Sequence, residues 1–306
     1  LLYSRFFMQA LSYKNEKVYI KEPFKGLFTQ GMVCHETYKD ENNNWVSPDE
    51  LISKDGKKYL KNDTSKLIKV GPSESMSKSK KNTIDPENII NNYGADSVRL
   101  FILSDSPPEK DVQWSEEGII ASFKFIQKLW SLNEKVLEEI DKNHAKDNSA
   151  EFAKFTNRFI KKISNNLKNF HYNIIVANLH EMHSYLSKEI IKGYQKKTIL
   201  ENYKKILITM MPILPHLSNE CFESIKMDSK DINWPNYDEK QIKEESSIIV
   251  IQINGKKRGL INTKLDLEED DLLKLVKKDQ NINKYLSDKE VRKKIYIKNK
   301  LMNIII

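Results

Sequence analysis

The segment between residues 71 and 82 holds the highest density of side chains that could take part in chemistry. It runs Gly71-Pro72-Ser73-Glu74-Ser75-Met76-Ser77-Lys78-Ser79-Lys80-Lys81-Asn82 and is rich in small polar and basic residues. Few of these residues could join a hydrophobic core, so we expect an exposed, mobile loop. A flexible loop can bring a lysine to a developing negative charge, although five such residues alone also fit an ordinary solvated loop.

A second group of cations, Lys256, Lys257 and Arg258, follows the dipeptide Asn254-Gly255. Isoleucines alternate with other residues over 249–253, which predicts a strand. Asn-Gly then predicts a two-residue hairpin turn, because both turn positions require positive φ. The three cations are therefore expected near a hairpin tip, where they form either a binding surface or a solvated turn.

Other candidate residues do not form a recognisable site. His180 and His183 are three residues apart, which is not the His-Glu-x-x-His spacing of zinc enzymes, and no further ligand is apparent, so we predict no metal site. Cys34 and Cys221 lie far apart in sequence, as expected for free thiols in a reducing cytosol. The sequence also shows no paired carboxylates, Walker loop or nucleophile elbow.

Two short helices are predicted directly after the basic loop. Asp85 is a candidate N-cap and Pro86 suits the first helical position, while Gly94 marks the end of the first helix. The second helix would contain the apolar residues between 98 and 103 and end before Pro107.

Helical periodicity continues from residue 114 to about residue 225. Apolar residues recur at three- and four-residue intervals in three stripes: Ile119, Phe123, Ile126 and Trp130; Phe152, Phe155, Phe159, Ile163 and Leu167; Ile175, Leu179, Met182 and Leu186. Such stripes must cover one another, which predicts a helix bundle. Lysines of this region, Lys161, Lys162, Lys196 and Lys197, are expected on solvated helix faces.

The two ends of the chain have mixed patterns. Residues 1–10 resemble the middle of an amphipathic helix without an N-cap, so the chain looks truncated or split upstream. The polar stretch around 42–56 predicts an inserted hairpin or loop. After a linker at 228–245, strands and a helix capped by Asp266 predict a small α+β domain.

Bulk composition favours a soluble protein with a polyanionic partner. The formal net charge is +8 and the sequence pI is about 9.1, which suits RNA, although Lys, Asn and Ile are abundant throughout and part of the excess is open to explanation as compositional drift. No apolar run approaches the roughly 20 residues that cross a bilayer, and the first residues do not form a signal peptide. We expect a cytoplasmic protein that does not contact a membrane.

The basic loop resembles a known signature. Ser75-Met76-Ser77-Lys78-Ser79 is similar to the second signature of class I aminoacyl-tRNA synthetases, Lys-Met-Ser-Lys-Ser, with Ser75 in place of the first lysine. The order and spacing of neighbouring segments resemble the leucyl branch of that family. These segments are 22–25, 29–33, 93–99, 106–108, 211–218 and the Asn-Gly-Lys-x-Arg-Gly run at 254–259.

The resemblance implies a function and its residues. Lys78 would contact ATP phosphates, with Ser77 and Ser79 shaping the loop and Met76 anchoring it. ATP would enter with Mg²⁺, and Lys80 or Lys81 would compensate for the charge that Ser75 lacks. The hairpin cations Lys256, Lys257 and Arg258 would contact the tRNA sugar-phosphate backbone.

The resemblance also implies a multidomain architecture, α/β plus all-α. Residues 1–112 would form the C-terminal part of the catalytic domain, a partial Rossmann-like fold with its signature loop at 75–79. Residues 113–238 would form a helical bundle of the anticodon-binding type, and residues 246–306 a small α+β tRNA-binding domain.

The expected activity is that of a leucine–tRNA ligase, with leucine, ATP and tRNA-Leu as substrates. Because the first signature motif is absent from these residues, the chain would be a C-terminal fragment or split subunit that needs an N-terminal half for catalysis. Two alternatives stay open: a non-catalytic tRNA-binding module derived from a synthetase, and a class I synthetase for isoleucine, valine or methionine.

Overall fold

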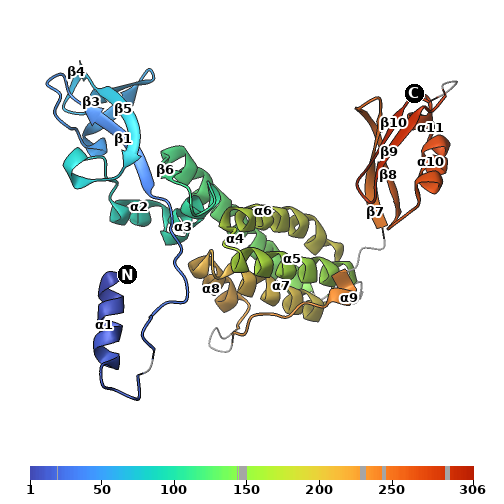
Figure 1. The fold of residues 1–306 in the computed structure, drawn as a ribbon, viewed down its shortest axis with the longest axis horizontal. Coiled ribbons are helices and arrows are strands. Elements are labelled where there is room, and N and C mark those ends of the chain that lie inside the picture. The colour runs from blue at the N-terminus through green and yellow to red at the C-terminus, as the bar shows by residue number, and fades with distance from the viewer. Residues whose placement is uncertain (19, 143, 145–149, 228–231, 243–245, 287–289) are drawn as a thin grey trace. The chain divides into compact units, whose positions relative to one another are not determined.

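The computed structural model describes residues 1–306 except 19, 143, 145–149, 228–231, 243–245 and 287–289 (Figure 1). The described residues form two compact units, Leu1–Tyr237 and Asp238–Ile306. The domain boundary predicted near residue 112, between the catalytic part and the helical bundle, falls inside the first unit. It therefore remains a prediction from the sequence. None of the described helices combines the length and the apolar character that crossing a bilayer requires.

The first unit contains two small sheets besides its helices. β1 (Val33–Lys39) lies between β5 (Lys69–Ser75), which is antiparallel to it, and β6 (Val112–Gln113), which is parallel. The second sheet is the antiparallel meander β2 (Leu51–Lys54), β3 (Lys57–Leu60) and β4 (Asp63–Leu67). The meander begins inside the predicted insertion at 42–56 and continues beyond it, and Asp55 and Gly56 make its first turn with φ of 52° and 74°.

The helices on either side of these sheets agree with their predicted limits. α1 (Leu2–Ser12) has no side-chain cap and no buried residue. α2 (Pro86–Tyr93) begins after Asp85, whose side chain accepts a hydrogen bond from the Glu87 amide, and ends at Gly94 with φ of 80°. α3 (Ala95–Ser104) follows directly. Local capping chemistry therefore predicted both ends of α2.

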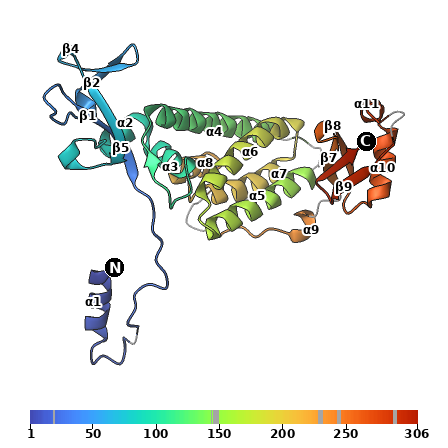
Figure 2. The ribbon, with the colours of Figure 1, turned by 45° about the horizontal axis from the view of Figure 1, so that its top comes forward.

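The remaining helices of the first unit form the predicted bundle. These helices are α4 (Glu116–Lys142), α5 (Ala150–Lys168), α6 (Tyr172–Glu189), α7 (Lys196–Met210) and α8 (Pro215–Ser224). α5 packs against α6 and α7, while α4 packs against α6, α7 and α8 (Figures 1 and 2). The main hydrophobic core of the unit lies among them.

The predicted stripe is buried on α6 and only partly buried on α4. Ile175, Leu179, Met182 and Leu186 of α6 are each at most 1% exposed. On α4, Trp130 is 36% exposed, and the buried face instead contains Phe125, Leu129, Leu132 and Val136. The reason is that α4 is also contacted near its beginning by α2, where Phe123 meets Tyr93 edge to face. Its apolar residues therefore face more than one neighbour.

α3 is joined to the segment before α8 and to the first turn of α8 by side-chain-to-backbone hydrogen bonds. The Arg99 guanidinium donates to the carbonyl oxygens of Pro212, at 2.7 Å, and Ile213, at 3.1 Å. The Asp96 carboxylate accepts from the Leu217 amide at 2.8 Å and is buried. These bonds fix the helix pair α2–α3 to the bundle.

The second unit is an α+β fold. Its sheet has the order β8-β7-β10-β9, formed by β7 (Ser246–Ile253), β8 (Lys256–Lys264), β9 (Lys293–Ile297) and β10 (Leu301–Ile305). β7 and β10 are parallel, and the other pairs are antiparallel. α10 (Glu269–Lys278) and α11 (Gln280–Asn283) contribute Leu272, Val276 and Ile282 to a separate core. The short α9 (Glu239–Ile242) precedes β7.

The predicted cap of α10 is displaced by two residues. The N-cap residue is Glu268, not Asp266. Asp266 has φ of 58°, and its carboxylate accepts from the Asn299 side chain at 2.9 Å. Asp266 therefore closes a turn against the β9–β10 connection, a long-range contact that a local capping pattern does not contain. The predicted linker 228–245 lies partly outside the described residues.

Candidate functional site

The loop predicted to carry chemistry begins directly at the end of β5. Ser75 is the last residue of the strand, and Lys78–Lys80 form one 3₁₀ turn. The Ser77 hydroxyl caps this turn by accepting from the Lys80 amide at 3.3 Å, and it lies 3.2 Å from the Ser79 hydroxyl. Both serines therefore shape the turn, and the loop has a defined conformation rather than an irregular one.

One buried side chain fixes the base of this loop. Asn82 is 0% exposed. Its carbonyl oxygen accepts from the Ser77 amide at 2.9 Å, while its NH₂ group donates to the carbonyls of His35 and Glu74, each at 3.2 Å. Because His35 lies on β1 and Glu74 on β5, Asn82 attaches the loop to both strands. The sequence placed Asn82 in the loop but gave no sign of this role.

The lysines of the loop differ in their partners. Lys80 forms an ion pair with Glu74, so its charge is already compensated. Lys78 and Lys81 are exposed, and among the described residues Lys78 has neither an ion pair nor a hydrogen bond from its ammonium group. Met76 is half-buried, and its amide donates to the Val33 carbonyl at 3.3 Å. The turn thus holds Lys78 out from the fold as an available cation.

His35, whose backbone carbonyl bonds to Asn82 at the base of the loop, has a shifted pKa. Burial lowers the pKa of His35 below its usual value of 6.5, and the nearby carboxylate of Glu36 partly opposes this effect. Among the described residues, the His35 Nδ1 atom is buried without a hydrogen-bond partner. A neutral imidazole is therefore favoured beside the base of the loop.

The chemistry of the loop suits a polyphosphate. Exposed lysine and serine groups are donors to phosphate oxygens. No carboxylate cluster is present to hold a metal by itself, because no group of three or more His, Cys, Asp and Glu residues in the described part of the chain could ligate an ion.

The three cations of the hairpin in the second unit differ in their exposure and contacts. Asn254 and Gly255 form the turn with φ of 49° and 77°, as predicted. Lys256 and Lys257 are exposed. Arg258 is the extra residue in a β-bulge, and its guanidinium lies 4.1 Å from the ring centroid of Tyr285.

Two glycines of the hairpin contact other elements of the second unit. A side chain at Gly259 would meet the Ile282 side chain at 2.4 Å. The Gly255 amide donates to the Asn303 side chain at 3.0 Å, which ties the turn to β10. Sequence reasoning predicted the turn but not the bulge, because the bulge depends on packing against α11.

The two histidines of α6 contact an aromatic ring of the bundle, and the two cysteines are buried. His180 stacks on Phe125 with ring centroids 3.6 Å apart, and His183 meets the same ring edge to face. Cys34 and Cys221 are free and buried, and burial raises the pKa of the Cys221 thiol to about 11.

The fold and the loop define a class of protein. Residues 64–115, which include the loop, match the family described as tRNA synthetases class I (I, L, M and V). Residues 149–274 match the family described as the anticodon-binding domain of tRNA ligase. Two regions of the chain are therefore similar to families of class I tRNA synthetases, one in its α/β part and one that begins in its helical part.

Within that class, the chain is homologous over its whole length to leucine–tRNA ligases. It is 40% identical to the leucine–tRNA ligase of Orientia tsutsugamushi (strain Boryong) and 37% identical to that of Rickettsia bellii (strain RML369-C), covering 100% of this chain each time. The chain spans 36% of the length of each of these two relatives.

A solved structure shares the fold. The crystal structure of the LeuRS of Agrobacterium radiobacter K84, in a ternary complex with tRNA and LeuAMS, matches with a TM-score of 0.65 and 21% sequence identity. The match covers 100% of this chain and 35% of that chain.

Proposed function

We propose that this chain is part of a leucine–tRNA ligase, which forms leucyl-adenylate from leucine and ATP and then transfers the leucyl group to tRNA-Leu. Homology to leucine–tRNA ligases along the whole chain supports this function, and it favours a ligase over a non-catalytic tRNA-binding module. The observation that carries the proposal is the exposed Lys78 on a turn that Asn82 attaches to two strands.

Lys78 is the proposed phosphate-binding residue of the reaction. When the leucine carboxylate attacks the α-phosphorus of ATP, negative charge accumulates on the departing pyrophosphate. A cation that meets this charge lowers the barrier, because it interacts more strongly with the transition state than with the ground state. Ser77 and Ser79 maintain the turn, Met76 attaches its start, and Mg²⁺ bound to ATP would add to the same neutralisation.

The departure at Ser75 is consistent with this mechanism. The residue at this position ends β5 and is exposed, whereas the exposed Lys81 lies beyond the turn in a left-handed conformation with φ of 53°. Lys81, rather than the paired Lys80, is therefore the better candidate to supply the charge that Ser75 lacks. Lys256, Lys257 and Arg258 are proposed to contact the tRNA backbone, with the two exposed lysines contributing most.

Amino-acid-dependent pyrophosphate exchange by the full-length protein tests the proposal. Exchange should require leucine and should not be supported by isoleucine, valine or methionine at comparable concentrations. A protein that exchanges only with one of the other three amino acids would be a different class I synthetase. Binding of tRNA-Leu without any exchange would instead identify a non-catalytic module.

A further inference from the structure

The sheet of the second unit is covered by helices on one face. Along β7 and β10, buried residues alternate with more exposed ones, as expected for strands with one covered face. The buried residues of the sheet pack against Leu272 and Val276 of α10 and Ile282 of α11. Figure 1 shows both helices on the same side of the sheet. Among the described residues, the opposite face is open, and we call it the open face.

The open face is apolar, although strand residues that face water are usually polar. Leu260 of β8 pairs with Val250 of β7. Val250 pairs in turn with Leu301 of β10, which pairs with Ile297 of β9, so one aliphatic row crosses all four strands. Leu260 and Ile297 are 50% and 51% exposed, and Ile248 on the same face is 61% exposed. Scattered apolar residues are normal on a surface, but a continuous row indicates that another molecule covers it.

The charged residues of the open face have one sign. By the strand register, they are Lys257, Lys264 and Lys293. These lysines belong to β8 and β9, which are the two edge strands, so cations flank the aliphatic row. None of the described strand residues on this face is acidic. The acidic residues 269–271 lie in the first turn of α10, on the covered side of the sheet.

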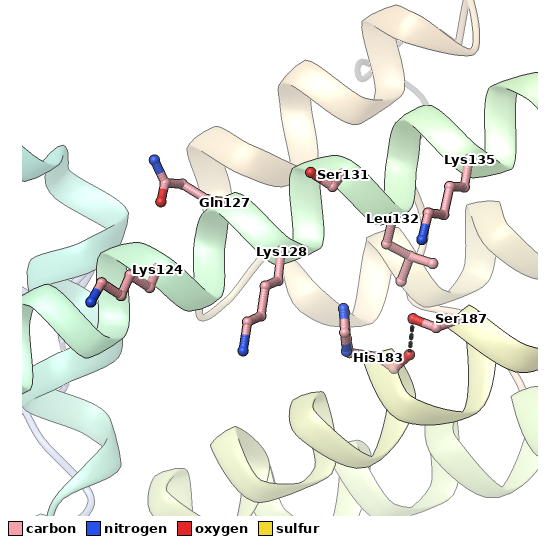
Figure 3. Close-up of a pocket in the computed structure, with 8 residues that line it drawn as sticks. All are labelled: Lys124, Gln127, Lys128, Ser131, Leu132, Lys135, His183 and Ser187. Carbon is pink, nitrogen blue, oxygen red and sulfur yellow. Dashed lines mark hydrogen bonds between the residues drawn. The ribbon is translucent and has the colours of Figure 1, made fainter.

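The groove on the bundle between α4 and α6 is a different kind of surface. Figure 3 shows its lysines along α4, and Leu132 is the one apolar residue among those that line it. Lysines on a helix face are stable in water and need no partner to cover them. Exposed aliphatic side chains on a sheet are different, because their contact with water is unfavourable. The open face is therefore the clearer sign of an interaction surface.

We propose that the open face binds an amphipathic helix of a partner protein, with acidic residues on both sides of the helix's apolar stripe. The two edge strands lie roughly 14 Å apart, at about 4.8 Å between neighbours, and a helix is about 10 Å across, so one helix fits between the lysines. The bound helix completes three layers, with helices on both faces of the sheet. Apolar contact supplies most of the affinity, and carboxylates that meet Lys264 and Lys293 fix the orientation.

Two other occupants fit the open face less well. A second copy of the chain, placed face to face, would bring lysines of both copies together without a carboxylate from either face, and like charges repel. An RNA strand would gain little from the aliphatic row, because bases stack on aromatic rings. None of the described strand residues on the open face is aromatic.

Binding of a synthetic helix to the chain tests the proposal. The probe is a fluorescent peptide of about 18 residues, with leucines along one helical face and glutamates beside them. A second peptide has lysine in place of every glutamate. Fluorescence anisotropy at low salt should show that the acidic peptide binds about tenfold more tightly than the basic one, and high salt should reduce this difference.

Substitutions on the open face should abolish this binding. The triple variant I248T/L260T/I297T should bind the acidic peptide at least about tenfold more weakly, because the aliphatic row is lost, while threonine keeps a high strand propensity. The matched control is I52T/L67T/V70T, which changes three exposed aliphatic residues on strands of the first unit. Circular dichroism of each variant checks that the chain is folded.

Two further measurements locate the bound peptide. The double variant K264Q/K293Q should bind the acidic and basic peptides with more similar affinities, because the flanking charges are lost. A photoreactive group on the apolar side of the acidic peptide should crosslink to residues 246–264 and 293–305, as read by mass spectrometry. Crosslinks confined to the first unit would overturn the proposal.

The remaining outcomes also decide the question. Equal binding of the acidic peptide by the wild type and the threonine variant, or equal binding of the two peptides by the wild type, would overturn the proposal. So would sedimentation showing that the wild type dimerises and the threonine variant does not, because a second copy would then cover the face. Loss of tRNA-Leu binding in the threonine variant would assign the face to RNA instead. None of these measurements uses leucine or ATP, so they are separate from the test of the proposed function.

Discussion

The loop after β5 and the hairpin between β7 and β8 both expose lysines, but different bonds hold them. In the loop, the buried side chain of Asn82 connects Ser77 to the carbonyls of His35 and Glu74, and His35 is 47 residues away. In the hairpin, the residues at 254–255 adopt positive φ and the strands pair on either side. The loop depends mainly on one long-range side chain, whereas the hairpin combines a local backbone conformation with a hydrogen bond from Gly255 to Asn303 of β10.

The difference has a consequence for function. A turn that is closed by its own backbone presents its cations in one place, which suits a permanent contact with a sugar-phosphate backbone. The loop is attached at its base, by the side chain of Asn82 and by the Met76 amide, and Lys78 is exposed beyond that base. That arrangement suits a charge that must follow phosphates through a reaction. Substitutions in the two regions should therefore affect different steps.

The largest effect is expected at Lys78. Lys78→Ala should lower leucine-dependent pyrophosphate exchange by the full-length protein by about 100- to 1,000-fold, because one electrostatic donor to the transition state is lost. The control is Lys57→Ala, an exposed lysine on β3, which should leave the rate unchanged. An unaltered exchange rate in the Lys78 variant would show that the loop takes no part in the reaction.

Asn82→Ala should separate the loop from its supporting strands. Three hydrogen bonds are lost and two carbonyls on β1 and β5 lose a partner, so the free energy of unfolding should fall by about 1–3 kcal/mol. Exchange should also slow by about tenfold, because the turn no longer presents Lys78 in one position. Denaturant titration and exchange assays measure the two effects, with the exposed Asn42→Ala as control. Full activity would show that Lys78 needs no such support.

A smaller effect is expected at the hairpin. The double variant Lys256→Ala/Lys257→Ala should weaken tRNA-Leu binding by about three- to tenfold and reduce the salt slope by about 2, in proportion to the phosphates released. Filter binding over a salt series measures both quantities. If the affinity falls without a change in slope, the two lysines do not meet phosphates, and the hairpin would act through its shape.

The smallest predicted effect is a loss of stability in mild acid that occurs in the first unit and not in the second. His35, His180 and His183 have lowered pKa values, mainly because of burial, and all six histidines precede residue 238. The unfolded chain therefore binds more protons below its histidine pKa of about 6.5, and the first unit loses stability as pH falls through this range.

Hydrogen exchange measured in the intact chain at pH 7.5 and pH 5.5, after correction for intrinsic rates, tests this difference. Protection should decrease in the bundle and stay constant in the sheet of the second unit, where no histidine titrates. Equal loss of protection in both units would mean that groups other than these histidines control the response.

Local sequence information was sufficient for elements whose limits are set by neighbouring residues. Asp85, Pro86 and Gly94 define both ends of α2, and the Asn-Gly dipeptide at 254–255 defines the hairpin turn. The apolar stripe of α6 was also readable, because one face of that helix is buried. For the helix ends and the turn, the determining contacts lie within a few residues.

The features that the sequence did not reveal depend on distant partners. The bonds of Asn82, the ion pair of Lys80 with Glu74 and the stacking of Arg258 on Tyr285 each require a folded neighbour. Family resemblance indicated which residues matter, but it did not indicate which of the lysines would be free of a partner.

The bonds that join α3 to the segment before α8 affect how this protein can vary during evolution. Arg99 and Asp96 recognise only peptide carbonyl and amide groups at Pro212, Ile213 and Leu217, and every residue type carries a carbonyl. The recognised positions can therefore change identity while the attachment survives, provided that an amide remains at position 217. The two side chains on α3 have no such freedom. Substitutions should therefore be tolerated far better at positions 212, 213 and 217 than at positions 96 and 99.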